Sequence, residues 1–218
     1  MNSRQRLEIA LSHQEPDRVP IDLGSVVTGI TTGANNSLKA CLGIDSDDPV
    51  VDRMQQLANP SEAILDRLHV DNRYLYLKAA SGWQDIELPD DVYEDELGVR
   101  RKAAYRDDGH LLYYDFVGHP LSDIETVADL AKYKWPDPHD PARWEGLEQA
   151  ARDLCAHTEY AVVVNLIGVV FEFSWYLRGY VGFMQDLLLN TRLSEALLDA
   201  MLEYQSALMN EMLDRVGD

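Results

Sequence analysis

The sequence predicts an α/β fold built around a parallel sheet, and three observations lead to this prediction. Apolar strand-like segments alternate with helical segments along the chain, which is the pattern of β/α units. The segment 160–167 is apolar throughout rather than alternating, as expected for a strand covered on both faces. The run from Arg18 to Ser25 passes from an apolar stretch into a small, hydroxyl-bearing turn, as where an active-site loop follows a barrel strand.

The first half of the chain is expected to hold three helices and two strands. Apolar residues at helical spacing predict helices over 2–13, over 34–42 and from Pro60 onward. Aliphatic and aromatic residues predict strands over 18–23 and 71–78. Between the first strand and the second helix, a stretch rich in Gly, Thr and Ser predicts a loop over 24–33.

The second half begins with a change of character over 81–120. Aromatic and β-branched runs separated by Asp107-Asp-Gly109 predict antiparallel hairpins inserted into the main fold. Helices are expected over 123–133 and 142–157, followed by the third strand over 160–167 and then by helices. In the last helix an apolar stripe predicts core packing, at Leu197, Met201, Tyr204, Leu208 and Met212.

Composition and charge exclude several classes of function. The chain has 218 residues, 46% of them hydrophobic and 26% charged, as in ordinary globular proteins. Its net charge of -19 repels phosphate backbones, so we expect no nucleic-acid partner. No segment approaches the ~20 apolar residues of a membrane span, and no export signal is evident, so we expect no membrane association. Cys41 and Cys155 are expected to be reduced thiols of a cytoplasmic protein.

A series of short motifs resembles the uroporphyrinogen decarboxylase superfamily, in the family's order and over nearly the whole chain. The motifs are Glu15-Pro-Asp-Arg-Val-Pro20, Gln55-Gln-Leu-Ala-Asn-Pro60, Leu68-His-Val-Asp71, Tyr93-Glu-Asp-Glu-Leu-Gly-Val99, His119-Pro-Leu121, Tyr133-Lys-Trp-Pro-Asp-Pro138 and the segment from Phe171 to Asp186. The resemblance implies a TIM-type (β/α)8 barrel, incomplete here. Residues 1–218 would be the N-terminal part of one barrel domain, about its first three β/α units, with 81–120 as a hairpin insertion and the C-terminal part absent.

The superfamily it resembles contains two chemistries, tetrapyrrole decarboxylation and methyl transfer from a corrinoid cobalt to a thiol. True decarboxylases continue the first strand into an arginine-rich motif that binds substrate carboxylates. Here the matching stretch is Arg18-Val-Pro-Ile-Asp22 followed by Leu23-Gly-Ser25, and after Arg18 no arginine occurs before Arg53. The position of the decarboxylases' catalytic aspartate falls on Lys78, and their third-strand tyrosine falls near Trp175 or Tyr176. The resemblance therefore favours the methyltransferase branch over uroporphyrinogen decarboxylase.

For a methyltransferase, the resemblance implies a methylated corrinoid protein and a small thiol as partners, and a zinc ion that activates the thiol. The zinc ligands of that branch are a His-x-Cys pair and a later Cys, and no histidine in this chain stands two residues from a cysteine. We expect this chain to bind neither zinc nor corrinoid itself. A catalytically inactive fragment or a binding module stays open as a third alternative, and an open barrel edge would make the isolated chain self-associate.

Nine residues are candidates for a substrate pocket. Polar side chains at the ends of expected strands, or within apolar surroundings, favour Asp22, Ser25, Thr28, Lys78, Asn165, Glu172 and Arg178. Gln55 lies on the segment that leads into Pro60, and the resemblance adds Tyr176, near which the decarboxylases' third-strand tyrosine falls. Other roles remain open for several of them. Asp22, Ser25 and Thr28 could serve turns and caps, and Lys78 could lie on the surface. Glu172 could form a structural ion pair with Arg178. No residue is assigned as catalytic.

Overall fold

The computed structural model describes residues 1–166 and 168–217. It divides into two compact units, which we describe separately: the first contains 1–77 and 146–165, and the second contains 78–145 and the chain from 166 onward. Ile167, the last residue of the third expected strand, and Asp218 lie outside the described residues.

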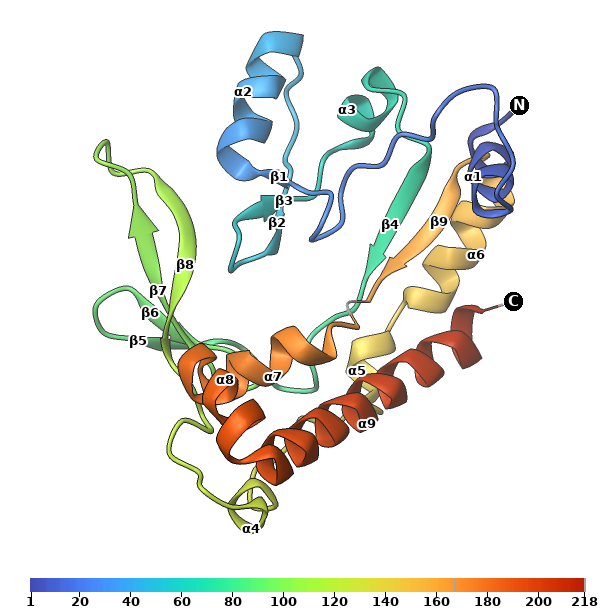
Figure 1. The fold of residues 1–218 in the computed structure, drawn as a ribbon. Coiled ribbons are helices and arrows are strands. Elements are labelled where there is room, and N and C mark those ends of the chain that lie inside the picture. The colour runs from blue at the N-terminus through green and yellow to red at the C-terminus, as the bar shows by residue number, and fades with distance from the viewer. Residues whose placement is uncertain (167, 218) are drawn as a thin grey trace. The chain divides into compact units, whose positions relative to one another are not determined.

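The first unit contains a parallel pair of strands. β4 (Asn72–Tyr76) and β9 (Ala161–Asn165) run side by side, with Asn72 opposite Ala161 and Tyr76 opposite Asn165 (Figure 1). Helix α6 (Leu147–His157) packs against both strands, and α1 (Ser3–Leu11) packs against β9. Both strands lie in segments from which the sequence predicts parallel strands.

Short elements complete the first unit. A small antiparallel sheet has the order β1-β3-β2; one helix lies between its first and second strands in the chain, and another follows its third strand. These elements are β1 (Ile30–Thr31), α2 (Thr32–Leu42), β2 (Val50–Asp52), β3 (Leu57–Ala58) and α3 (Glu62–Arg67). The side chain of Thr31 caps α2 by accepting a hydrogen bond from the backbone of Ala34.

The second unit begins with a four-stranded antiparallel sheet in which consecutive strands are neighbours. It lies within the range 81–120 for which the sequence predicts hairpins. Its strands are β5 (Ile86–Leu88), β6 (Val92–Glu94), β7 (Arg100–Tyr105) and β8 (Leu111–Gly118).

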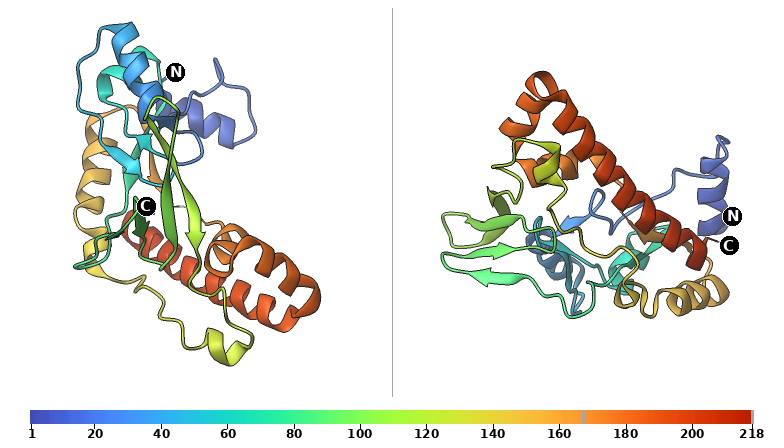
Figure 2. Two further views of the ribbon diagram at one scale, coloured as in Figure 1. Left: turned by 90° about the vertical axis from the view of Figure 1, so that its left-hand side faces the viewer. Right: turned by 90° about the horizontal axis from the view of Figure 1, so that it is seen from below.

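Helices make up the rest of the second unit. They are α4 (Val127–Leu130), α5 (Pro141–Trp144), α7 (Val170–Arg178), α8 (Tyr180–Leu189) and α9 (Thr191–Val216). The last three pack against one another, with α9 the longest (Figure 2). Their contact buries Phe183, Leu193, Leu197 and Met201 almost completely, in agreement with the apolar stripe read from the sequence.

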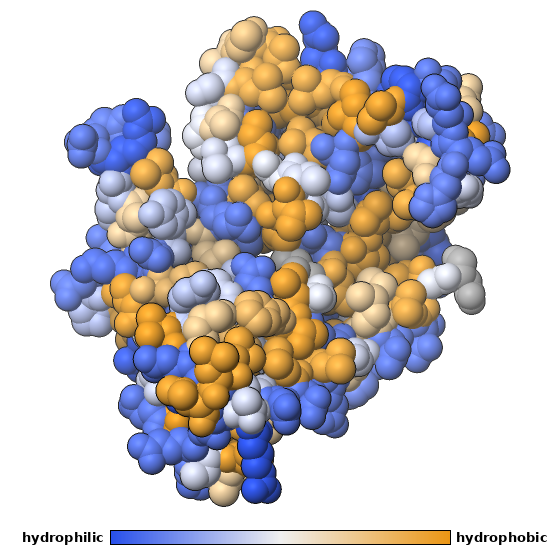
Figure 3. Space-filling view, in the orientation of Figure 1, coloured by the Kyte–Doolittle hydropathy of each residue, from blue (hydrophilic) through white to orange (hydrophobic). Residues whose placement is uncertain are grey.

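One face of the second unit exposes apolar side chains. Apolar groups gather over α7 and α8 (Figure 3), and the largest exposed ones there are Phe171, Tyr180, Val181, Leu188 and Leu189. Self-association of the chain stays a prediction, and light scattering would test it. In the described residues, no helix combines the length and the apolar character needed to cross a membrane.

The predicted TIM-type barrel is wrong. The described residues form one parallel pair of strands and two antiparallel sheets, not the first three units of a β/α barrel. Residues 18–23 form no strand. Pro20 has no backbone N–H to donate, and the N–H of Ile21 is bound by the side chain of Asp71 at 2.8 Å. Two neighbouring donors that a strand ladder would use are therefore missing or already engaged.

Candidate functional site

A network of ion pairs lies at the amino end of β4, where motif residues from distant parts of the chain meet. The carboxylate of Asp71, which is only 1% exposed, accepts hydrogen bonds from Arg6 at 2.6 Å and from Arg18 at 2.6 and 2.8 Å. Arg6 also pairs with Asp17 at 2.6 Å. We call these four residues the amino-end network. Burial acts to raise the pKa of Asp71, but hydrogen bonds from Arg18, Ile21, Ser3 and Arg6 outweigh it and hold that pKa below its usual range.

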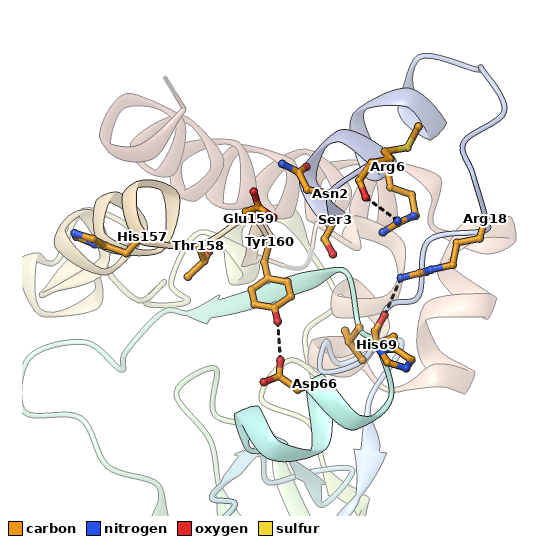
Figure 4. Close-up of a pocket in the computed structure, with 12 residues that line it drawn as sticks. Asn2, Ser3, Arg6, Arg18, Asp66, His69, His157, Thr158, Glu159 and Tyr160 are labelled. Atoms are coloured by element: carbon orange, nitrogen blue, oxygen red, sulfur yellow. Dashed lines mark hydrogen bonds between the residues drawn. The ribbon is translucent and has the colours of Figure 1, made fainter.

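A cavity of about 570 Å³ adjoins this network and is shown in Figure 4. Arg6 and Arg18 line it, but their guanidinium groups already bind Asp17, Asp71 and backbone carbonyls. On the opposite wall, Tyr160 donates a hydrogen bond to Asp66 at 2.6 Å. Because these charges are engaged with one another, the cavity walls favour a structural role over anion binding.

A second polar group lies along one face of β4, from its first residue, Asn72, to its last, Tyr76. The Asp22 carboxylate accepts hydrogen bonds from Asn72 Nδ2 at 2.8 Å, Tyr74 OH at 2.9 Å and Thr28 Oγ1 at 3.0 Å. Ser25 Oγ lies 2.9 Å from Thr28 Oγ1. We call Asp22, Ser25, Thr28, Asn72, Tyr74 and Tyr76 the strand-end cluster. Ligands of α/β proteins bind at the carboxyl ends of parallel strands, and the cluster reaches that end of β4 at Tyr76, so this is the candidate site.

Local geometry explains how the cluster forms. Side chains alternate across a strand, so Asn72, Tyr74 and Tyr76 share one face of β4. Tyr76 OH donates to the carbonyl oxygen of Gly24 at 2.5 Å, which ties the loop after Leu23 to that face. Gly24 has φ +131°, and a Cβ there would lie 3.1 Å from the Tyr74 ring. Any larger residue at position 24 would strain the loop and push against the ring.

The electrostatics of the cluster leave one negative charge. Burial, followed by the hydrogen bond to Asp22, raises the pKa of Tyr74, and burial raises the pKa of Tyr76 to about 12. Both phenols therefore stay protonated at neutral pH and act as donors. Among the described residues, every hydrogen-bond donor to Asp22 is neutral. The amide oxygen of Asn72, buried and without a partner among these residues, adds a further acceptor.

Five of the nine residues singled out from the sequence lie in the first unit. Asp22, Ser25 and Thr28 are members of the strand-end cluster. Gln55 donates from Nε2 to the carbonyl of Val26 in the same loop, at 3.2 Å. Asn165 ends β9 directly opposite Tyr76, so both side chains are on the same face of the parallel pair.

The other four residues belong to the second unit and engage local partners. Lys78 forms an exposed ion pair with Glu145 at 2.9 Å. Glu172 accepts a hydrogen bond from the hydroxyl of Tyr176, one turn later in α7. Arg178 pairs with Asp186 at 2.6 Å, so the expected alternative of a Glu172–Arg178 ion pair is wrong.

Three members of the cluster were not singled out from the sequence. Asn72, Tyr74 and Tyr76 read as ordinary strand residues in the run Asn72-Arg-Tyr-Leu-Tyr76. The signal that identifies them is their spacing of two, which places three hydrogen-bonding side chains on one face.

The described residues gather no set of three or more His, Cys, Asp or Glu side chains suited to a metal ion. Cys41 and Cys155 are both exposed and unpaired. The residues present thus do not fit the zinc centre that the resemblance implies. No protein-family model, no curated protein and no solved structure matches this chain.

Proposed function

We propose that this chain takes part in methyl transfer from a methylated corrinoid protein to a small thiol. The proposal rests on the ordered motifs that resemble the methyltransferase branch of the uroporphyrinogen decarboxylase superfamily. It also rests on one structural observation, the strand-end cluster. Since the chain's own residues do not fit a zinc centre, we assign no step to zinc, and the role of this chain is to bind the acceptor molecule.

The observation that carries the proposal is the charge of the cluster. Asp22 is held by Asn72, Tyr74 and Thr28, which orient the carboxylate without neutralising it. A carboxylate in this state attracts a cation or a strong hydrogen-bond donor. The acceptor that suits it is therefore a thiol with an amino group, whose ammonium would pair with Asp22.

The same charge disfavours tetrapyrrole decarboxylation. A substrate with many carboxylates needs cations to offset the loss of its solvation. The strand-end cluster offers a carboxylate and neutral donors instead. Arg6 and Arg18, the arginines of the amino-end network, are engaged with Asp17 and Asp71.

The test follows methyl loss from methylcobalamin. The chain is incubated with methylcobalamin and either cysteamine, an aminothiol, or 2-mercaptoethanesulfonate, an anionic thiol, while absorbance records demethylation and mass spectrometry detects the S-methyl product. We expect turnover with cysteamine to exceed turnover with the sulfonate, and Asp22→Asn to remove most of this preference. Asp115→Asn, an exposed substitution on β8, is the matched control.

Two other outcomes would redirect the assignment. Conversion of uroporphyrinogen to coproporphyrinogen by the same preparation would replace methyl transfer with decarboxylation. Cysteamine binding that depends on Asp22, with neither reaction, would leave a binding module as the function.

A further inference from the structure

The second unit contains a cavity that the proposed function does not use. It measures about 520 Å³, within the range of about 300–1,000 Å³ typical of small-molecule sites. We call it the meander cavity because its wall begins on the antiparallel meander β5–β8. The rest of the wall comes from Trp83, which precedes β5, and from the segment between β8 and α5. Three motifs that carry the family resemblance line it, those at 93–99, 119–121 and 133–138.

Most of the meander cavity's wall is apolar. Trp83, Leu97, Leu121 and Ile124 supply hydrocarbon and indole surface. Tyr133 presents its ring, because its hydroxyl already donates to the carbonyl of Leu97 at 2.7 Å. A wall of this kind favours a ligand with an aromatic or branched aliphatic body.

The acidic residues of the wall are neutralised by specific partners. Glu94 pairs with Arg100 at 2.8 Å, and Glu96 pairs with the buried Arg143. Asp129 pairs with Lys132 at 2.8 Å. These pairs leave no uncompensated negative charge in the part of the wall that the structure describes.

Two donors of the wall have no protein acceptor within the described ranges. Lys134 forms no ion pair there, so its ammonium is the uncompensated charge of the wall. The indole N–H of Trp83 is buried without a hydrogen-bond partner, and an indole nitrogen can only donate. Buried polar groups are normally satisfied, so an unsatisfied donor on a cavity wall points to an acceptor that the chain itself does not provide.

We propose that the meander cavity binds a small monocarboxylate with an apolar body. The body lies against the wall formed by Trp83, Leu97, Ile124 and Tyr133. The carboxylate pairs with Lys134 and, after a small rotation of the indole, accepts the N–H of Trp83. This site is independent of the strand-end cluster, whose charge has the opposite sign.

The test compares an acid with its neutral amide. Isothermal titration calorimetry of the full chain is performed with 4-phenylbutyrate and with 4-phenylbutanamide, which share the same apolar body. We expect the acid to bind more tightly than the amide by about fivefold, the upper range for a solvent-exposed ion pair. Lys134→Gln should remove this difference while leaving the affinity for the amide unchanged.

Two further variants separate the site from general electrostatics. Lys102→Gln removes an exposed cation of β7 that does not line the cavity, and it should leave both affinities unchanged. Trp83→Phe keeps the aromatic surface and removes the donor, and it should weaken binding of the acid by about threefold. Circular dichroism checks that each variant is folded. Equal affinities for acid and amide, no saturable binding of either ligand, or equal losses in Lys134→Gln and Lys102→Gln would each overturn the proposal.

Discussion

Two aspartates lie beside β4, one directly before its first residue and one against its side-chain face, and the difference between them separates scaffold from site. At the amino end, Asp71 is buried and bound by two guanidinium groups. On the side-chain face of β4, Asp22 is exposed and bound by an amide, a phenol and a hydroxyl. Both carboxylates accept several hydrogen bonds, so the presence of such bonds does not distinguish them. The charge of their donors does.

This difference has an energetic consequence. Removing one member of a buried ion pair leaves the other charge uncompensated in a poorly solvated place, which is strongly destabilising. Removing an exposed carboxylate held by neutral donors leaves no charge uncompensated. We therefore expect substitutions at the two aspartates to separate stability from binding.

The largest effect is expected from Asp71→Asn. The substitution leaves Arg6 and Arg18 without their shared counter-charge, and we expect it to lower the free energy of unfolding by about 3–5 kcal/mol. Urea denaturation followed by circular dichroism measures the change. The control Asp115→Asn, exposed on β8, should change stability by less than about 0.5 kcal/mol. A loss as small as that of the control would show that the network does not stabilise the fold.

Acid should weaken the same network. The pKa of Asp71 is lower in the folded chain than in the unfolded chain. Its stabilisation is therefore complete above the unfolded value of about 3.9 and is lost as the pH falls through the folded value. Urea midpoints measured from pH 6 down to pH 2.5 should fall steeply below about pH 4. In Asp71→Asn part of this slope should disappear, and an unchanged slope would assign the acid sensitivity to other carboxylates.

A smaller loss is expected from Tyr76→Phe. The variant keeps the ring and removes the hydroxyl that holds the carbonyl of Gly24. We expect it to cost about 0.5–1.5 kcal/mol in urea denaturation. It should also loosen the loop after Leu23, which hydrogen exchange of the Gly24 amide would report. Unchanged exchange would mean that the ring alone positions the loop.

The smallest effect on stability is expected from Asp22→Asn, at about 0.5 kcal/mol or less. Its effect on cysteamine binding should be the largest of these four tests, because the net charge of the cluster disappears. Calorimetric titration of cysteamine measures the loss. If Asp22→Asn destabilised the chain as strongly as Asp71→Asn, both aspartates would be scaffold and the candidate site would be lost.

Local patterns predicted the elements better than their assembly. Apolar runs located β4, β9 and the packed helix α9, because hydrophobic periodicity is a local property of the chain. The strand predicted over 18–23 does not form, because a side chain takes the place of a neighbouring strand: the carboxylate of Asp71, fifty residues away, binds the N–H of Ile21. Nothing in the local sequence reports that competition. The incomplete barrel implied by the resemblance uses 18–23 as its first strand, so it is wrong for the same reason.

The candidate site was predictable in part. Asp22, Ser25 and Thr28 follow an apolar run and could be selected by position alone. Asn72 and Tyr74 required knowledge of which face of β4 meets the loop at 22–28, a long-range contact. Lys78 and Arg178 were selected for their charge, yet each engages an acidic partner within its own unit. A single charged residue at an expected strand end is therefore weaker support for a functional site than several hydrogen-bonding side chains on one face of a strand.

Two hydrogen bonds between Ile21 and Asp71 fix the position of this part of the chain relative to β4. The backbone of Asp71 donates to the carbonyl of Ile21, and its side chain accepts from the N–H of the same residue. These two hydrogen bonds fix the register of the following residues against β4, so that Asp22 lies beside Asn72 and Tyr74. One residue inserted between Ile21 and Asp22 would leave every helix and strand in place and shift the carboxylate out of reach. The number of residues in the chain at this point is thus more tightly constrained than the identity of their side chains. An alignment of natural relatives would show this constraint as an absence of insertions here.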